Sequence, residues 1–207
     1  MIKEPVIILA NGDYPFHPIP VQKINEAGAI ICCDGAVNQL IVNELEPDVI
    51  IGDLDSLDSS IKKKYSQKII HFPDQDDNDL RKAIRWAEDE GIKEATILGA
   101  TGKRDDHSVA NIFILLQFST SLNCTLITNH GVFNTAEGRE EFQSSIGQQV
   151  SLFSADPEIE ITSINLKYNF ISRNLTNLYC GSLNESISET FTLILSHGKI
   201  LVYQEFS

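Results

Sequence analysis

Aspartates follow short apolar segments at several places in the sequence, and carboxylates placed in this way could bind a metal ion. The clearest case is "IIGDLDS", residues 50–56, in which Asp53 and Asp55 come directly after two isoleucines and Gly52. Two carboxylates about 5 Å apart repel each other by roughly 3 kcal/mol at an effective dielectric constant near 20. Residues two positions apart in an extended segment point the same way, so this pair could share one cation. Oxygen ligands favour Mg²⁺ over Zn²⁺.

Comparable polar clusters follow the other apolar segments of the first half. An isolated pair of aspartates is usually a solvated loop, but clusters that converge on one place are far more informative. Glycines beside the carboxylates would let a ligand approach the backbone closely, and Lys103, Arg104 and His107 could donate to phosphate oxygens. The clusters are Asn11-Gly12-Asp13, Asp34-Gly35, Asp53-Leu54-Asp55-Ser56, residues 73–79 (PDQDDND) and residues 101–107 (TGKRDDH).

The elements that would position these clusters are short strands of a parallel sheet. The apolar segments are nearly continuous in Val, Ile and Leu, which is typical of strands buried on both faces. The carboxyl ends of such strands lie at one edge, where α/β proteins bind ligands. The predicted strands are the segments PVIILA, GAIICC, PDVIIG, QKIIHF, EATILG and CTLIT, between residues 5 and 128.

The clearest crossover helix is expected in "NDLRKAIRWAEDEG", residues 78–91. Asp77 or Asn78 can cap its first turn and Gly91 can end it. Its apolar residues form one helical stripe, which predicts that this face covers the sheet. The stripe consists of Leu80, Ala83, Ile84 and Ala87.

The second half contains strand patterns without intervening helices. Strands are predicted in QQVSLFSA, IEITSINLKY, LYCGSL and TFTLILSHGKILVYQEF, the last as a hairpin that turns near Gly198. The expected fold is therefore α/β: an N-terminal doubly wound, mostly parallel sheet with helices on both faces, plus a small C-terminal all-β sandwich. We place the α/β domain at residues 1–131 and the sandwich at residues 132–207. About 75 residues make a thin sandwich, which should pack on the first domain, on a partner chain, or on both.

Composition excludes several classes of function. The 207 residues carry a formal net charge of −13, which argues against binding to nucleic acid and to anionic membranes. The N-terminal segment does not resemble a signal peptide, and no window reaches the ~20 apolar residues of a membrane helix. The four cysteines contain no CxxC pair, so reduced structural thiols and a cytoplasmic location are expected.

The motifs together resemble the thiamine pyrophosphokinase family. The family pattern runs approximately DGGAN, GDxDS, QDxTDxxKA and GxxGGRxDHxxAN. The sequence has these blocks in the same order, as DGAVN, GDLDS, QDDNDLRKA and GATGKRDDHSVAN, over residues 34–111. In the second half, NLKYNF stands where the family has GLKYPL, and GSLNES where it has GxSNE.

The resemblance implies a role for each matching residue. Asp34 and Gly35 would line the nucleotide side of the cleft, together with Asn11, Gly12 and Lys103 from the polar clusters. Asp53, Asp55 and Asp79 would hold Mg²⁺ and the triphosphate of ATP, and Gln75 would lie beside the substrate. Arg104, Asp106 and His107 would bind or polarise the phosphates. Asn184 would help to hold thiamine, near the interface of a homodimer.

Five positions depart from the family pattern. Ala36 and Val37 replace Gly and Ala of DGGAN, Lys103 replaces the second Gly of GGR, and Asn78 replaces the Thr of QDxTD. Leu183 replaces the Ser of SNE, with Ser182 displaced by one residue. The last departure bears most directly on how thiamine would be held.

The implied reaction is transfer of a pyrophosphoryl group from ATP to the hydroxyl of thiamine, with release of AMP. Catalysis would consist mainly of positioning and charge neutralisation, with an Arg104-type donor stabilising charge on the transferred group. Either Asp55 or Asp79 could accept the hydroxyl proton. Two alternatives are a DxD glycosyltransferase that uses a nucleotide sugar, and a nucleotide sensor without catalytic activity, which the Leu183 departure favours.

Overall fold

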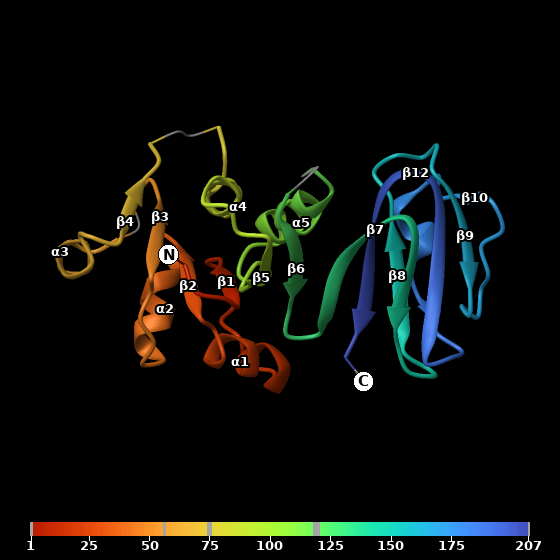
Figure 1. Ribbon diagram of the computed structural model, residues 1–207, viewed down its shortest axis with the longest axis horizontal. Coiled ribbons are helices and arrows are strands. Elements are labelled where there is room, and N and C mark those ends of the chain that lie inside the picture. Colours follow the sequence, from red (N-terminus) through yellow and green to blue (C-terminus); the bar gives the residue numbers. More distant parts are fainter. Residues whose placement is uncertain (1, 56, 74–75, 118–120, 207) are drawn as a thin grey trace. The chain divides into compact units, whose positions relative to one another are not determined.

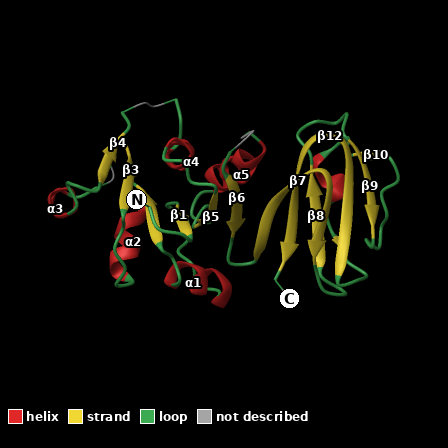
Figure 2. Ribbon diagram, viewed as in Figure 1, coloured by secondary structure: helices red, strands yellow, loops and turns green. Residues whose placement is uncertain are grey.

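The chain forms two compact units, each with its own core (Figure 1). The computed structural model describes residues 2–55, 57–73, 76–117 and 121–206. The first unit contains residues up to 114 and the segment that ends at 129, whereas the second contains residues from 130 onward together with the segment that starts at 115. Helices are concentrated in the first unit, and strands dominate the second (Figure 2).

The first unit is built on a parallel sheet. Its strands pair in the order β4-β3-β2-β1-β5-β6, and every neighbouring pair runs parallel. The residues of β1, β2 and β3 are all buried, as the continuous apolar segments predict. All the strands predicted in this half are confirmed. They are β1 (Val6–Leu9), β2 (Ala29–Cys33), β3 (Val49–Gly52), β4 (Ile69–His71), β5 (Glu94–Leu98) and β6 (Asn123–Ile127).

Helices cover both faces of this sheet, which confirms the doubly wound prediction. Helices α4 and α5 lie on one face, and α1 and α2 lie on the other (Figure 1). Residues 79–89 form the predicted helix: Asn78 caps it by accepting a hydrogen bond from the backbone N–H of Arg81 (2.9 Å). The helices are α1 (Pro18–Asn25), α2 (Ala36–Val42), α3 (Ser59–Lys64), α4 (Asp79–Asp89) and α5 (Asp105–Phe113), with the 3₁₀ turn η1 (Ile114–Leu116) after α5.

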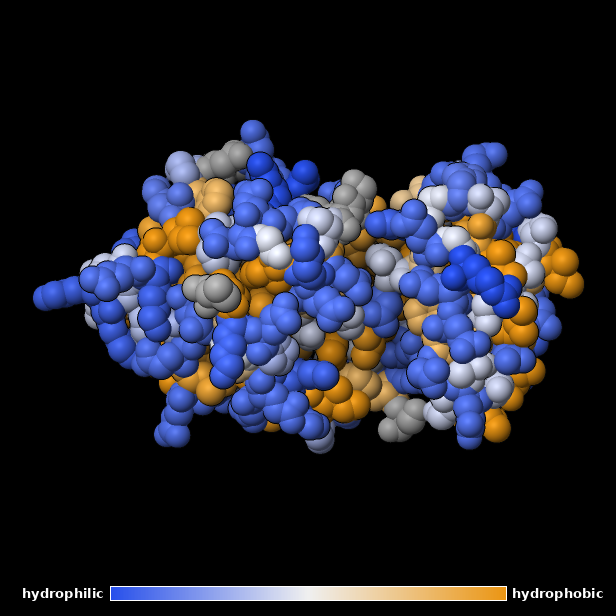
Figure 3. Space-filling view, in the orientation of Figure 1, coloured by the Kyte–Doolittle hydropathy of each residue, from blue (hydrophilic) through white to orange (hydrophobic). Residues whose placement is uncertain are grey.

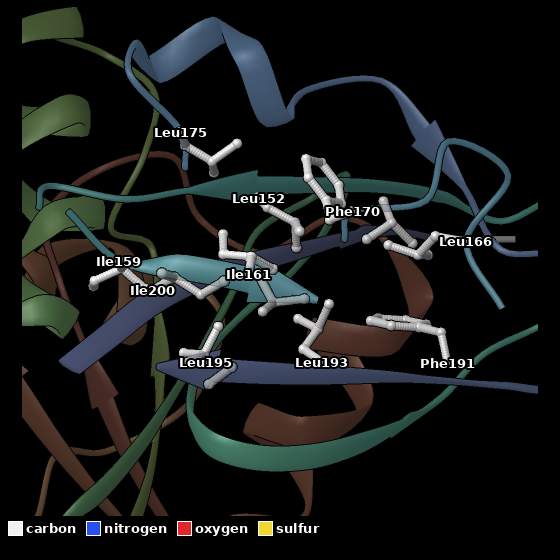
Figure 4. Close-up of a cluster of buried hydrophobic side chains, with 13 residues drawn as sticks. Leu152, Ile159, Ile161, Leu166, Phe170, Leu175, Phe191, Leu193, Leu195 and Ile200 are labelled. Atoms are coloured by element: carbon white, nitrogen blue, oxygen red, sulfur yellow. The ribbon is translucent and has the colours of Figure 1, made fainter. Parts of the chain in front are cut away.

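The second unit is organised around one long strand, β12, and confirms the all-β prediction. This strand pairs antiparallel with β7 along most of its length, and with β9 and β8 along its two halves. Side chains from these strands and from the loops between them converge in one core (Figure 4). The elements are β7 (Gly131–Gln143), β8 (Gln149–Phe153), β9 (Glu160–Ile164), β10 (Arg173–Asn174), η2 (Leu178–Gly181), β11 (Asn184–Glu185) and β12 (Thr190–Glu205).

Two predictions in this half are wrong. The chain does not turn back at Gly198, because the residues before and after it pair with the same strand β7 in the same direction, separated by a register shift between Ile194 and Lys199. This bulge accommodates the SHG segment within β12. The segment LYCGSL is not a strand: it forms η2, in which the Cys180 N–H bonds to the Asn177 carbonyl at 3.0 Å.

Polar side chains dominate one face of the molecule (Figure 3), and the cysteines are free thiols. Hydrophilic side chains cover most of the visible face of the molecule (Figure 3). None of the helices in the described part of the chain has the length and apolar character needed to cross a bilayer. The four cysteines are free, and burial raises the pKa of the Cys33 thiol well above its usual value.

Candidate active site

The loops that follow the parallel strands all leave the same edge of the first unit's sheet. The chain moves outward from β1 through β2 and β3 to β4, and α4 then returns it to β5 on the other side of β1. The loops after β1 and β5 therefore run in opposite directions, which is the arrangement that opens a ligand crevice in doubly wound folds. Most of the predicted site residues lie in, or directly after, the loops that follow the parallel strands.

The loops after β1 and β5 are bonded directly to each other. The N–H of Gly12 donates to the Gly99 carbonyl at 2.6 Å, and the N–H of Asp13 donates to the Thr101 carbonyl at 2.8 Å. A Cβ atom on Gly12 would collide with the carbonyl oxygens of Thr101 and Gly99. Glycine at position 12 is therefore required for the packing of the two loops.

A basic side chain crosses between these loops. The Nζ atom of Lys103 donates to Oδ1 of Asn11 at 2.9 Å, and the Asn11 side chain packs so closely on Gly35 that a Cβ there would collide with it. The structure thus brings together predicted nucleotide-side residues from three loops. Lys103 adopts a positive φ of 58°, a conformation in which the family's glycine would carry less strain.

An acidic cluster surrounds the end of β3. A Cβ atom on Gly52 would lie 2.6 Å from Cβ of Asp34 and 3.3 Å from Oδ1 of Asp79, so both acidic residues pack against this glycine. Asp34 is buried, with 1% of its surface exposed. Burial raises the pKa of Asp79, Lys82 lowers it, and the nearby charge of Asp53 raises it further. The structure therefore brings Asp34, Asp53 and Asp79 together, as the shared sheet edge predicts.

Lys82 is a functional candidate that sequence reasoning missed. Its side chain is only 4% exposed, and its Nζ lies 3.4 Å from Oδ1 of Asp79. An ammonium group buried in this way needs compensating charge, and Asp79 supplies it. The signal was present in the sequence, because Asp79 and Lys82 are three residues apart on one helix and such pairs are neighbours.

The segment Asp53-Leu54-Asp55 is not extended, which corrects the geometric argument for a shared cation. Oδ1 of Asp53 accepts a hydrogen bond from the N–H of Asp55 at 3.1 Å, and Leu54 has a positive φ of 69°. The Asp53 side chain thus closes a tight turn. Strand alternation therefore does not place the carboxylates of Asp53 and Asp55 on the same side of the chain.

The acidic cluster is suited to a hard cation by the type of its ligands. Asp34, Asp53 and Asp79 offer oxygen only, which is the chemistry that Mg²⁺ prefers. In the parts of the chain that the structure describes, no three His, Cys, Asp or Glu side chains form a metal-binding group by themselves. Mg²⁺ usually takes one or two protein carboxylates and completes its shell with water and substrate phosphates.

Arg104 and Asp106 form a bidentate pair at the start of α5. Nε of Arg104 lies 3.1 Å from one oxygen of Asp106, Nη2 lies 2.6 Å from the other, and the His107 N–H donates to the same carboxylate at 2.9 Å. The arginine and aspartate side chains are 68% and 62% exposed. The pair therefore presents a preorganised guanidinium at the carboxyl edge, and the His107 side chain is exposed beside it.

We expect the Asp106 carboxyl to titrate with a pKa of about 2, because the Arg104 guanidinium hydrogen-bonds to it. Since the pKa is lower in the folded state, this pair stabilises the fold above the ordinary pKa near 3.8 and ceases to do so as the pH falls toward 2. Carboxyl ¹³C chemical shifts measured against pH test this. Arg104→Met should return the pKa toward 3.8, whereas an unchanged titration would show that the pair does not form in solution.

Two predicted residues are not part of this crevice as described. Gln75 lies outside the residues that the structure describes. Asn184 is buried, and its amide makes three bonds within its own unit: its Oδ1 accepts from the N–H groups of Tyr168 (3.0 Å) and Glu185 (2.9 Å), and its Nδ2 donates to the Tyr168 carbonyl at 2.8 Å. Asn184 thus fixes the backbone around Tyr168. Leu183, the departure from the family pattern, has a φ of 58° and is 76% exposed.

Comparison with known proteins assigns both units to one family. The model of the thiamin pyrophosphokinase catalytic domain matches residues 21–127, and that of the thiamin pyrophosphokinase substrate-binding domain matches residues 131–203. The chain belongs to the thiamine pyrophosphokinase family. The motif resemblance is confirmed, and the family assignment gives no support to a glycosyltransferase.

Relatives in this family are distant in sequence. Thiamin pyrophosphokinase 1 of Caenorhabditis elegans is 26% identical over 159 residues, which cover 70% of this chain and 65% of that relative. Thiamine pyrophosphokinase 1 of Oryza sativa is 26% identical over 204 residues, which cover 84% of this chain and 76% of that relative. The match thus spans slightly less than two thirds of the nematode protein.

Solved structures of thiamine pyrophosphokinases share the fold. The structure from Bacillus subtilis superposes with a TM-score of 0.81 at 21% identity, over 98% of this chain and 99% of that one. The structure from Candida albicans superposes with a TM-score of 0.77 at 18% identity, over 98% of this chain and 90% of that one. The architecture of both units is therefore that of the family.

Proposed function

We propose that the protein is a thiamine diphosphokinase that transfers the pyrophosphoryl group of ATP to the hydroxyl of thiamine. The observation that carries this proposal is the convergence of acidic and basic side chains at one edge of the first unit's sheet. Asp34, Asp53 and Asp79 gather around the end of β3, and Lys103 lies in the adjoining loops. Membership of the thiamine pyrophosphokinase family supports pyrophosphoryl transfer as the reaction that these side chains would catalyse.

The chemistry requires attack on the β-phosphorus of ATP. A bond forms between the hydroxyl oxygen of thiamine and that phosphorus, and the bond between the phosphorus and the oxygen that bridges to the α-phosphate breaks. AMP leaves with the electron pair of the broken bond. The hydroxyl proton passes to a carboxylate, for which Asp55 and Asp79 are the candidates.

We propose Mg²⁺ as the cofactor, held by Asp53, Asp55 and Asp79. When it is bound, the cation offsets the charge of the triphosphate. The protein's own contribution is to hold the carboxylates at the end of β3 and the start of α4, with Lys82 balancing part of their charge. Because these groups are fixed before substrate arrives, little reorganisation is needed in the transition state.

Basic residues would bind the phosphates, and the adjoining loops would bind the nucleoside. Arg104 presents a guanidinium already oriented by Asp106, and Lys103 and His107 lie in the same segment. A guanidinium fixed in this way stabilises charge that develops on the transferred group. Asn11, Gly12, Asp34 and Gly35 would form the nucleotide side of the crevice.

Thiamine would bind with the help of the second unit in a homodimer. Apolar side chains near Asn184 are exposed to solvent, among them Tyr168, Tyr179 and Leu183. Such exposed groups are typical of surfaces that another chain covers. In this arrangement Asn184 acts by fixing the backbone around Tyr168, and Gln75 would lie beside the substrate. The free cysteines support a cytoplasmic location.

The test is to incubate the purified protein with ATP, Mg²⁺ and thiamine and to quantify the products. We expect equimolar AMP and thiamine diphosphate, and a loss of activity of about 10²-fold or more in Asp55→Ala. Asp58→Ala is the matched control, because Asp58 is exposed in the same loop and makes no capping bond; it should keep wild-type activity. ADP with thiamine monophosphate would instead show attack on the γ-phosphorus, and no turnover despite ATP binding would favour a sensor.

A further inference from the structure

Two side-chain amides, those of Asn78 and Asn111, link the start of α4 to the loop after β5. Nδ2 of Asn78 donates to Oδ1 of Asn111 at 3.1 Å. Nδ2 of Asn111 donates to the carbonyl of Ala100 at 2.8 Å. Oδ1 of Asn78 also accepts from the N–H of Arg81 and so caps α4. The chain of bonds therefore runs from the β5 loop, through α5, to the residue that precedes Asp79.

The direction of every bond in this chain is determined by its two ends. The Arg81 N–H can only donate, so it requires the oxygen of Asn78 and leaves the Asn78 amino group facing Asn111. Asn111 must then present its oxygen to Asn78 and its amino group to Ala100, whose carbonyl can only accept. Turning either amide over would break two bonds at once. The two asparagines therefore hold each other in one orientation.

The two ends of this chain of hydrogen bonds lie next to the two groups of residues that the proposed reaction would use. Asp79 immediately follows Asn78 and belongs to the acidic cluster. Ala100 lies between Gly99 and Thr101, whose carbonyls bond to the β1 loop at 2.6 Å and 2.8 Å. Lys103 follows in the same segment. Fixing the separation between these two groups would fix the acidic cluster relative to the phosphate-binding loops.

We propose that Asn111, acting through Asn78, is a positioning residue that sets Asp79 relative to the Gly99–Lys103 loop. The inference rests on the proposed function and adds a residue to it. Position 78 departs from the family pattern, in which Thr stands there. A hydroxyl can still cap the helix, but it is shorter than an amide and carries one oxygen in place of an oxygen and an amino group. At position 78 of this chain, the amide oxygen caps α4 while the separate amino group donates to Asn111.

The test compares Asn78→Ser, Asn111→Ala and the double variant by their kcat, their KM values and their melting temperatures. Asn78→Ser retains a hydroxyl that can cap α4, so this variant should fold with a melting temperature close to that of the wild type. We expect kcat to fall about 10-fold in each single variant with little change in the KM for thiamine, because displacing a catalytic group by a fraction of an ångström slows the chemical step. The double variant should be no slower than either single variant, since both remove one bridge.

Asn43→Ala is the matched control. Its amide also donates to a backbone carbonyl at a helix end, that of Gln39, at 2.8 Å, but it lies at the end of α2, outside the proposed bridge. It should leave kcat unchanged. Wild-type kcat in both single variants, or losses that multiply in the double variant, would overturn the proposal. A loss of melting temperature without a change in kcat would also overturn it, because that pattern marks a purely structural bond.

Failure of the proposed function would be seen separately. If the wild-type protein forms no AMP and thiamine diphosphate, the proposed reaction is wrong whatever the variants do. The bridge is then judged by calorimetric dissociation constants for ATP with Mg²⁺. Equal and non-additive weakening in the three variants would support it, and additive or absent effects would overturn it.

Discussion

Asp79→Asn is expected to lower the rate of thiamine diphosphate formation by about 10³-fold, in the range found when one preorganised electrostatic group is removed from an active site. Asparagine has the shape of aspartate, so α4 can still begin at this position and the carbonyl oxygen can still accept from Lys82. What is lost is one negative charge from the cluster that also contains Asp34 and Asp53. The expected defect is therefore in charge neutralisation of the triphosphate and not in folding.

The measurement is the rate of AMP release at saturating ATP and thiamine over a range of Mg²⁺ concentrations. Asp77→Asn is the control, because Asp77 lies two residues away but its carboxylate is engaged by Arg81 and Arg85 at 3.1 Å and 2.8 Å. It should stay within about threefold of the wild-type rate, as expected for a group outside the transition state. Retention of more than a tenth of wild-type activity in Asp79→Asn would contradict the proposed role of the acidic cluster.

Lys82→Met should lower the free energy of unfolding by about 2 kcal/mol, because removing the buried ammonium leaves Asp79 without compensation. The loss is smaller than for a fully buried pair because the Asp79 side chain is 34% exposed. Methionine fills a similar volume, so the effect isolates the charge. For a protein of this size the loss corresponds to a fall of about 6 °C in melting temperature. Lys64→Met provides the contrast: its ion pair with Glu46 is exposed, and exposed pairs contribute little, so its melting temperature should stay nearly unchanged.

The Lys82→Met variant should also acquire a distinctive pH dependence. Burial already raises the pKa of Asp79, and the variant removes the ammonium that lowers it. A carboxyl with a raised pKa in the folded state binds its proton more tightly there than in the unfolded chain, so stability is lost as the pH rises through that pKa. Melting temperatures in EDTA should therefore converge on those of the wild type as the pH is lowered from neutral through the raised pKa of Asp79. A constant difference across this range would show that Asp79 is not the partner left without compensation.

The parallel sheet could be predicted because each of its strands is a nearly continuous apolar segment in the sequence. Segments such as VIIL and AIICC are buried on both faces, so hydrophobic residues fill them without interruption. The same pattern predicted the position of the candidate site, because the loops that follow parallel strands all lie at one edge of the sheet. The stripe of α4 was equally clear because one face alone packs on the sheet.

Other features of the fold and the site depend on contacts between distant residues, which short sequence patterns do not reveal. Strand β7 was missed because residues 137–141 are exposed and largely charged, although pairing with β12 makes them a strand. The SHG segment has the composition of a turn, but β7 continues alongside it and converts it into a bulge. Burial of Lys82 and the amide bridge through Asn111 also arise only when separate elements meet. Position in the tertiary structure, and not local preference, decided each of these cases.

The place of β12 in the second unit has a consequence for the order in which the protein can fold during synthesis. Every strand of the first unit's sheet has been made once Ile127 has been added, so that unit can form its core while translation continues. Strands β7, β8 and β9 have their shared partner only when Thr190–Glu205 emerges. Until then β9 and β8 pair only with the two-residue strands β10 and β11. The nascent second unit is thus expected to expose apolar strand surface until the end of synthesis.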